Sequence, residues 1–274
     1  MNQENPTLTM IREFVALGRV EFDRPYTREG YDHGQGKLTE GMTAPGPDGK
    51  PTEMNDLLLR LLEPRAPYFD RLALDALDSG VTQVVNLGAG YDDRSLRFRS
   101  PGVRFFELDL PHVIADKTRR LAATDFDTSA ITLIEANLQT DSVGELLHAA
   151  GFDSSKPSLF LLEHVALFLE SSAVRSLLAS LAGQAANGSA LALTAEVHPQ
   201  GTDSAALLAT VDEILFGGTS PLHTIMSRDT WMDVLKTAGW EVRDPTHVTA
   251  VDHFQVPLGG QSTQVQTQFL TATA

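Results

Sequence analysis

Residues 81–98 read VTQVVNLGAGYDDRSLRF, and this stretch decides the fold. Val81 to Leu87 is an apolar run rich in β-branched side chains, which predicts a buried strand. The run ends in Gly88-Ala89-Gly90, where glycines allow the backbone to approach a ligand closely. Polar residues and a short helical pattern follow. A strand, a glycine turn and a helix in this order begin a nucleotide-type binding site in an α/β sheet.

Strands and helices alternate after this stretch. Apolar runs predict strands at 103–108, 131–134, 158–162, 190–197, 240–242 and 265–271. Helical patterns predict helices at 111–121, 143–150, 171–181, 203–215 and 227–238, with Ser171 or Ser172 as a cap of the third and Asp203 as a cap of the fourth. This alternation is typical of an α/β fold with a mostly parallel sheet and helices on both faces. The last two strands are compatible with an antiparallel hairpin at the sheet edge.

The first 79 residues predict an N-terminal helical cap. A helix is expected from Thr9 to Phe22, followed by a loop over 23–51 that is rich in Gly, Pro and charge. Asn55 is expected to cap the next helix, and Pro64 to break it before a second helix that runs to about Asp78. We therefore expect one domain over 1–274, with a cap or lid at 1–79, a ligand-binding core at 80–274 and a lid insertion near 199–226.

Composition excludes several classes of function. The formal net charge of −15 argues against a nucleic-acid partner, because phosphate backbones are bound by Lys and Arg. The chain has no Cys, which excludes disulfides, thiolate metal sites and a cysteine nucleophile. The first residues, MNQENPTLTM, do not resemble a signal peptide, and no apolar run approaches the roughly 18 residues of a membrane helix. We expect a cytoplasmic enzyme, monomeric or homodimeric, that acts on a small molecule and holds no metal.

Residues that could contact a ligand follow four of the predicted strands. In α/β sheets ligands bind beyond the carboxyl ends of the strands, so these groups are expected to meet. Asp109, with Glu107 two residues earlier, suits the ribose hydroxyls of a nucleoside. Asn137 and Leu138 suit the edge and the face of adenine. Glu163 and His164 follow the fourth strand.

The acidic pair Asp92-Asp93 bears on which nucleoside binds. A dinucleotide fingerprint has Gly or Ala where Asp93 stands, and two carboxylates at a helix start would repel a pyrophosphate. They would not repel a sulfonium cation that carries an amino group. The turn therefore favours S-adenosylmethionine over NAD. The alternative is that these carboxylates only cap the helix.

Five segments resemble the leucine carboxyl methyltransferase family, which includes bacterial polyketide carboxyl O-methyltransferases. In chain order they read EPRAPYFDRL, VVNLGAGYDDRSLRF, FFELDLPHVIADKTRRL, LLEHVALFLE and SRDTWMDVLKTAGWEV, and they cover roughly Arg65 to Val242. The family's VVNLGAGLDTRAYRL signature is similar to the second. The resemblance implies a class I methyltransferase fold with a Rossmann-like sheet, and S-adenosyl-L-methionine as cofactor.

The resemblance also implies roles for residues. Gly88 and Gly90 would contact the methionine part of the cofactor, Asp109 the ribose and Glu163 the amino group. Arg65 would bind a carboxylate of cofactor or acceptor; the alternative is a surface pair with Glu63 or Asp70. The implied cofactor site comprises Arg65, Gly88, Ala89, Gly90, Asp109, Leu110, Asn137, Leu138, Glu163 and His164.

Two departures from the family concern the acceptor. His164 stands where the family commonly has Gly, and the 23–51 loop does not look like the usual cap, in which Tyr31 and Lys37 are the weakly aligned candidates. His164, as a base or hydrogen-bond donor toward the acceptor, and His223 in a roof over the site are further candidates. For either histidine the alternative is a purely structural role. The candidate catalytic residues are therefore His164, Arg65, His223 and Tyr31.

The expected function is O-methylation of a small organic acid or phenol, with a natural-product (polyketide) carboxylate as one case. Methylation of a protein's C-terminal carboxylate is an alternative, as is a cyclase-like descendant that binds the cofactor without methyl transfer. An NAD-dependent oxidoreductase is disfavoured by Asp93.

Overall fold

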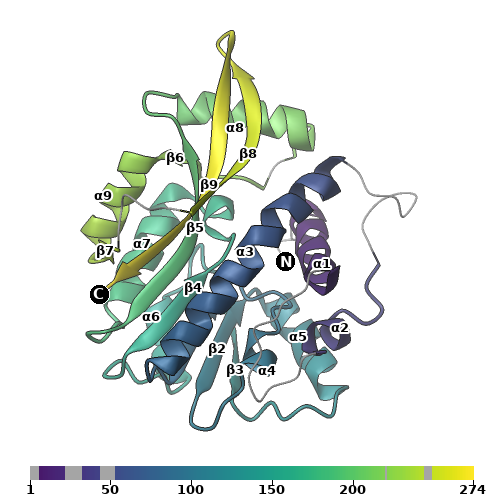
Figure 1. Ribbon diagram of the computed structural model, residues 1–274, viewed down its shortest axis with the longest axis vertical. Helices are drawn as coiled ribbons and strands as arrows, with labels where there is room; N and C mark the ends of the chain where they lie inside the picture. The colour runs from purple at the N-terminus through teal and green to yellow at the C-terminus, as the bar shows by residue number, and fades with distance from the viewer. Residues whose placement is uncertain (1–5, 22–32, 44–52, 220, 244–248) are drawn as a thin grey trace.

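The computed structural model describes residues 6–21, 33–43, 53–219, 221–243 and 249–274. Its centre is a mixed sheet in the strand order β3-β2-β1-β4-β5-β9-β7, with β6 paired to β5 and β8 paired to β9 (Figure 1). The strands are β1 (Gln83–Leu87), β2 (Arg104–Asp109), β3 (Ile131–Glu135), β4 (Ser158–Leu162), β5 (Ala190–His198), β6 (Met226–Ser227), β7 (Glu241–Val242), β8 (Thr249–Leu258) and β9 (Gln261–Thr273).

Helices cover both faces of this sheet. They are α1 (Pro6–Glu21), α2 (Gly34–Leu38), α3 (Glu53–Asp78), α4 (Arg94–Arg97), α5 (Pro111–Ala122), α6 (Val143–Ala149), α7 (Ser171–Ala182), α8 (Ser204–Val211) and α9 (Arg228–Ala238), with a 3-10 turn at Ala166–Phe168 and a π-helical turn at Asp212–Phe216. Because successive strand residues point to opposite faces, Val85 and Leu87 pack against α6, α7 and α9, whereas Val84 packs against α3. The predicted α/β fold is confirmed.

The strand order places the ends of β1 and β4 side by side. From β1 the chain proceeds outward to β2 and β3, and then returns to build β4 and β5 on the other side. The four pairs β1–β2, β2–β3, β1–β4 and β4–β5 are all parallel. The order therefore reverses between β1 and β4, and such a switch point leaves a crevice beyond the carboxyl ends of the strands.

The C-terminal strands are antiparallel, as predicted, but more extensive. β9 lies between β5 and β7 and is antiparallel to both. It also forms a hairpin with β8, which the sequence did not predict and which extends beyond the sheet next to α8 (Figure 1). The sequence of β8, TAVDHFQVPL, contains Asp252 and Pro257, two residue types that are depleted in strands. The short strand β6 was likewise not predicted.

Three expectations for the N-terminal part and the helix caps were wrong. α3 is one helix that continues through Pro64 and Pro67, so Pro64 does not break it and Asn55 lies within it. Packing explains this continuity, because Leu62, Ala66, Phe69 and Ala73 on α3 are completely buried and outweigh the roughly 3 kcal/mol cost of an internal proline. Residue Glu170, not a serine, precedes α7.

Part of the predicted loop over 23–51 is the helix α2. Gln35 explains its position, because Nε2 donates to the carbonyls of Ala16 in α1 (3.0 Å) and of Tyr91 after β1 (2.9 Å). Leu38 is fully buried against Leu96 and neighbours. These tertiary contacts stabilise α2. A helix of five residues is too short to show a helical period in the sequence, so it was not predicted.

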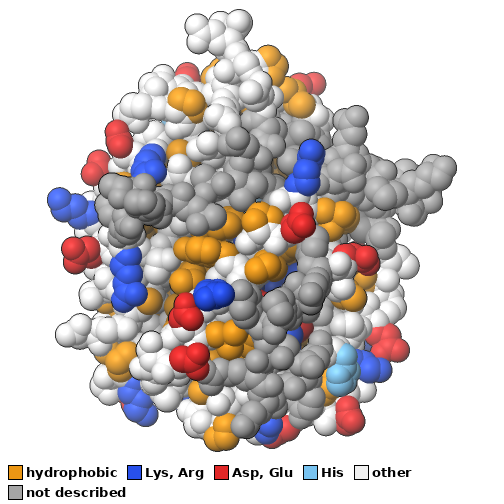
Figure 2. All heavy atoms as spheres, viewed as in Figure 1, with side chains coloured by type: hydrophobic (Ala, Val, Ile, Leu, Met, Phe, Trp, Pro, Cys, Tyr) orange, Lys and Arg blue, Asp and Glu red, His pale blue; other side chains and the backbone are white. Residues whose placement is uncertain are grey.

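Charged side chains of both signs are mixed on the face in view in Figure 2. Figure 2 shows Lys and Arg spaced singly among acidic side chains, with hydrophobic side chains gathered toward the middle of this face. Within the described residues no helix has the length and apolar character needed to cross a membrane. The same residues contain no cluster of His, Asp and Glu suited to a metal ion.

Candidate functional site

A cavity of about 380 Å³ lies beyond the carboxyl ends of β1, β2 and β4. The residues of the implied cofactor site all line it, together with His223, namely Arg65, Gly88, Ala89, Gly90, Asp109, Leu110, Asn137, Leu138, Glu163, His164 and His223. Tyr31 lies outside the described residues. Lys37 does not line the cavity and pairs with Glu40 on the surface. The size of the cavity is within the usual range for small-ligand sites.

The glycine turn forms the floor of the cavity. Gly88 and Gly90 have φ angles of 66° and 47°, in the left-handed region that favours glycine. The backbone N–H groups of Gly88 and Ala89 both donate to the carbonyl of Leu108 in β2, at 2.8 and 3.0 Å. A Cβ atom on Gly88 would lie 2.5 Å from Val165 Cγ2, so this position has no room for a side chain.

Asp109, at the end of β2, is held from two sides. One carboxylate oxygen accepts from the backbone N–H of Gly90 and the other from that of Leu110, each at 2.7 Å. A carboxylate offers about four lone-pair positions, so both oxygens can still accept a hydroxyl from a ligand. The turn and the carboxylate are therefore fixed relative to each other, as a ribose-binding role requires.

Asn137 and Leu138 follow β3 at the edge of the cavity. Asn137 forms a local turn in which its Oδ1 accepts from Gln139 N at 3.0 Å, and its own N–H donates to Asp141. Leu138 is buried, whereas Asn137 is exposed. The pair offers an apolar face beside an amide, which suits a flat heterocycle.

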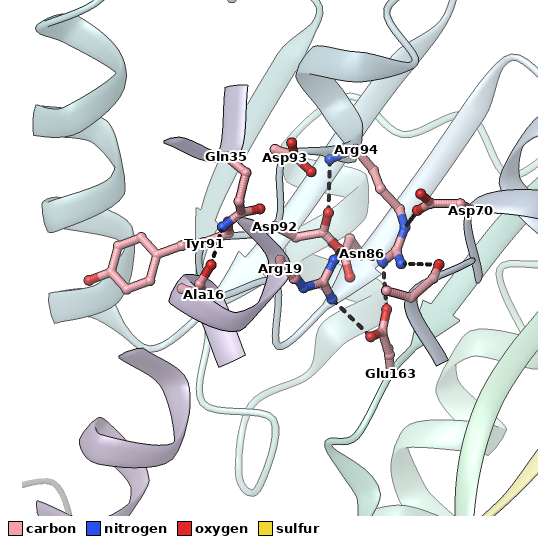
Figure 3. A network of polar contacts seen from close by, with 12 residues as sticks. Ala16, Arg19, Gln35, Asp70, Asn86, Tyr91, Asp92, Asp93, Arg94 and Glu163 are labelled. Atoms are coloured by element: carbon pink, nitrogen blue, oxygen red, sulfur yellow. Dashed lines mark hydrogen bonds and ion pairs between the residues drawn. The ribbon is translucent and has the colours of Figure 1, made fainter. Parts of the chain in front are cut away.

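Glu163, at the end of β4, lies among three arginines, of which Figure 3 labels Arg19 and Arg94. Its Oε1 accepts from Arg19 at 2.8 Å and from Arg65 at 2.9 Å, and its Oε2 accepts from Arg94 at 2.5 Å. Burial would raise the pKa of Glu163, but these three guanidinium groups lower it to about 2. The carboxylate is thus ionised, and the alternative that Arg65 pairs with Glu63 or Asp70 is wrong.

The acidic pair after the turn is also neutralised by arginines. Asp92 accepts from Arg94 at 2.6 Å, and Asp93 accepts from Arg97 at 3.0 Å. Burial opposes ionisation of Asp92, but Arg19, Arg94 and Lys117 outweigh it and lower the pKa of Asp92. The expectation that two uncompensated carboxylates repel a pyrophosphate is therefore wrong, and the charge argument against NAD loses its force.

Glu107 does not belong to the cavity. Its carboxylate is buried on β2 and accepts from Lys117 of α5, which also donates to the carbonyl of Asp92 at 2.7 Å. Burial raises the pKa of Glu107 in spite of Lys117. The Lys117–Glu107 pair and the bond to Asp92 thus connect α5 to β2 and to the glycine turn.

The two histidines differ in their surroundings. His164 directly follows Glu163, and its ring is buried, with Nδ1 at 3.5 Å from Glu196 Oε1 of β5. His223 lies at the rim, where its Nδ1 is 3.1 Å from Glu170 Oε1 and both side chains are about half exposed. His223 is the one described residue of 199–226 that lines the cavity, since α8 packs against the β8–β9 hairpin instead.

Arg19 is a site residue that the sequence reasoning missed. It lies in the last turn of α1, lines the cavity and is 5% exposed. Its Nη1 has no hydrogen-bond partner among the described residues, although Asp92 Oδ2 is 3.4 Å away. Burial opposes its charge, but Asp92 and Glu163 outweigh burial and raise the pKa of Arg19. The signal was available, because Arg19 continues the stripe of Ile11 and Val15 at helical spacing.

The comparisons with known proteins agree with this architecture. Residues 33–182 match the family described as leucine carboxyl methyltransferase. A "putative S-adenosyl-L-methionine-dependent methyltransferase" of Mycobacteroides abscessus is 32% identical over 68% of this chain, and one of Mycolicibacterium gilvum is 32% identical over 77% of it. The chain spans 64% and 70% of the length of these two relatives.

A solved structure resembles the fold over nearly its full length. The crystal structure of a "putative methyltransferase" from Thermobifida fusca superimposes with a TM-score of 0.55 and 15% identity, covering 94% of this chain and 93% of that one. At this identity the likeness concerns the fold alone.

Proposed function

The chain belongs to the leucine carboxyl methyltransferase family, and from this premise we propose that it is an S-adenosylmethionine-dependent O-methyltransferase of a small organic acid or phenol. The observation that carries the proposal is the cavity at the β1–β4 switch point, where the glycine turn, Asp109 and Glu163 converge. The names of the two relatives support the same cofactor.

The residues present fit this cofactor group by group. Asp109, with lone pairs remaining on both oxygens, would accept the ribose hydroxyls. Leu138 and Asn137 would contact adenine. Arg19 Nη1 is buried at the cavity and has no hydrogen-bond partner in the described part of the chain, so it would donate to the carboxylate of the methionine part.

Glu163 would act differently from a simple ammonium ligand. Three arginines already surround its carboxylate, so Glu163 would position Arg19 and Arg65 at the cavity. It stays a prediction that Glu163 also contacts the amino group. When bound, the cofactor supplies an electrophilic methyl group, and the task of the chain is to align an acceptor with it and to exclude water.

Binding of the cofactor product tests this proposal directly. Titration calorimetry with S-adenosylhomocysteine is expected to give one site per chain. The ligand should also raise Tm, because binding adds about 2.7 kcal/mol to the free energy of unfolding at a hundredfold excess over Kd. NAD serves as the comparison ligand. Absence of binding by S-adenosylhomocysteine, or preferential binding of NAD, would overturn the proposal.

A further inference from the structure

His164 has a backbone conformation that residues other than glycine rarely adopt. Its φ of 57° is positive, and among the described residues no other non-glycine residue has a positive φ. The left-handed region costs an L-residue roughly 1–2 kcal/mol relative to the usual conformations. The backbone N–H of His164 donates to Thr194 Oγ1 of β5 at 2.7 Å, which holds the residue in place. Such strain tends to persist where a side chain is needed for function.

The imidazole ring of His164 is oriented by its neighbours. Nδ1 faces Glu196 Oε1 at 3.5 Å, and the two side chains are 8% and 3% exposed. Glu196 Oε1 also accepts from Thr267 Oγ1 of β9 at 3.3 Å, and the edge of the ring meets Phe168. Because Nδ1 faces Glu196 and the residue lines the cavity, Nε2 is the nitrogen left for a ligand. A carboxylate behind one nitrogen of a histidine stabilises the imidazolium that forms when the other takes a proton.

Burial, reinforced by Arg65, favours the neutral form of His164 before reaction. Burial and then the positive charge of Arg65 from α3 lower the pKa of His164, while Glu196 from β5 and Glu163 from β4 oppose them. Thr194 and Phe168, which also contact His164, carry no charge. A neutral imidazole can accept a proton at Nε2, whereas a protonated one cannot.

We propose that His164, supported by Glu196, is a general base that removes the proton of a hydroxyl acceptor, so that the substrate is a phenol or enol and not a carboxylic acid. A carboxylic acid arrives already ionised and needs no base, whereas a phenol with a pKa of about 10 is protonated near neutral pH. A carboxylate beside His164 would also lie next to the buried charge of Glu196. This proposal rests on the proposed function.

The step balances in atoms and charge. The acceptor oxygen forms a bond to the methyl carbon, the C–S bond breaks, and its electron pair remains on sulfur. The hydroxyl proton moves to His164 Nε2 and then to solvent. Glu196 is a positioning residue that holds Nδ1–H toward itself and compensates the charge of the imidazolium.

The experiment compares two probes of similar size in the presence of S-adenosylhomocysteine. Para-nitrophenol changes its absorbance when it ionises, and para-nitrobenzoate is its carboxylate counterpart. We expect nitrophenol to bind as the phenolate at a pH where it is mostly neutral in solution, and more tightly than nitrobenzoate. His164→Gln should abolish the ionisation and weaken binding of nitrophenol about tenfold, as loss of a hydrogen bond to a charged group does. Calorimetry with S-adenosylhomocysteine first gives the concentration that saturates each variant, so that every nitrophenol titration is made on the loaded protein.

Two further measurements make the outcome decisive. NMR of labelled histidine should show His164 as the neutral Nδ1–H tautomer near neutral pH, and Glu196→Gln should lower its pKa further without loss of S-adenosylhomocysteine binding. His198→Gln is the matched control, because His198 is also buried but bonds to Ser204 outside the cavity, so this variant should keep the phenolate signal.

Three results would overturn the proposal: tighter binding of nitrobenzoate, binding of nitrophenol in its neutral form, or an Nε2–H tautomer of His164. If neither probe binds, the tautomer and the response to Glu196→Gln decide. Failure of the wild-type protein to bind S-adenosylhomocysteine would instead refute the proposed function, so the two failures are distinguishable.

Discussion

Replacement of Gly88 by Ala should destabilise the protein far more than one methyl group usually does. Two features of the turn act together at this position. The φ of 66° places an L-residue in the left-handed region. In addition, the new Cβ would lie 2.5 Å from Val165 Cγ2, a separation at which an atom must move.

The two costs can be assigned separate magnitudes. The backbone conformation contributes about 1–2 kcal/mol, and forcing a methyl group into a packed site contributes about 1–3 kcal/mol. The sum is about 2–5 kcal/mol. Gly102→Ala isolates the first cost, because Gly102 has a φ of 79° and nothing lies within 4 Å of the place that its new methyl group would take. That variant should lose only about 1–2 kcal/mol.

Urea denaturation with fixed m-values measures these differences. Val165→Ala provides the second arm of a double-mutant cycle, since it removes the atoms that the new methyl group meets. The coupling energy between the two substitutions should be favourable by about 1–3 kcal/mol. Equal losses for Gly88→Ala and Gly102→Ala, or zero coupling with Val165→Ala, would refute the reasoning about close approach.

Other predictions concern the charged groups. Because the pKa of Glu163 is about 2 instead of 4.5, its ionisation adds stability that is present above pH 4.5 and lost as the pH falls toward 2. The loss should amount to about 3 kcal/mol in the free energy of unfolding. It should be absent from the pH dependence of unfolding in Glu163→Gln. Arg19→Met should weaken S-adenosylhomocysteine at least about tenfold in calorimetry, since a charged hydrogen bond is removed, and unchanged affinity would exclude Arg19 from the site. His223→Ala should change the free energy of unfolding by less than about 1 kcal/mol, because its pair with Glu170 is half exposed; a larger change in urea unfolding would contradict this.

The sequence was most informative where local pattern and function coincide. The run before Gly88 is buried along its whole length in a parallel sheet, and its valines and leucine signal this, although Gln83 and Asn86 are buried there with hydrogen-bond partners. Asp109 and Glu163 lie at the ends of strands, so their meeting in one cavity could be predicted from topology alone. The same logic placed Asn137 at the edge.

Contacts distant in sequence explain the failures. Asp92 and Asp93 are an exception, because Arg94 and Arg97, which neutralise them, lie two and four residues further along the chain and were overlooked, whereas Arg19 is distant in sequence. The continuity of α3 through Pro64 depends on packing against the sheet, which local propensity does not contain. The left-handed backbone of His164 could not be anticipated either, since its stabilising bond comes from Thr194 on another strand.

The docking of α1 has a consequence for affinity measurements. Leu8, Ile11 and Val15 of this helix form a wall of the cavity, and Arg19 connects it to Glu163. A ligand that needs this wall binds only the docked population, so its apparent Kd equals the intrinsic Kd divided by the docked fraction. If one tenth of the molecules were docked, the apparent affinity would be about tenfold weaker with every contact in the bound state unchanged. Salt, acid or substitutions at the Arg19–Glu163 pair would then change the apparent Kd by shifting the docking equilibrium of α1.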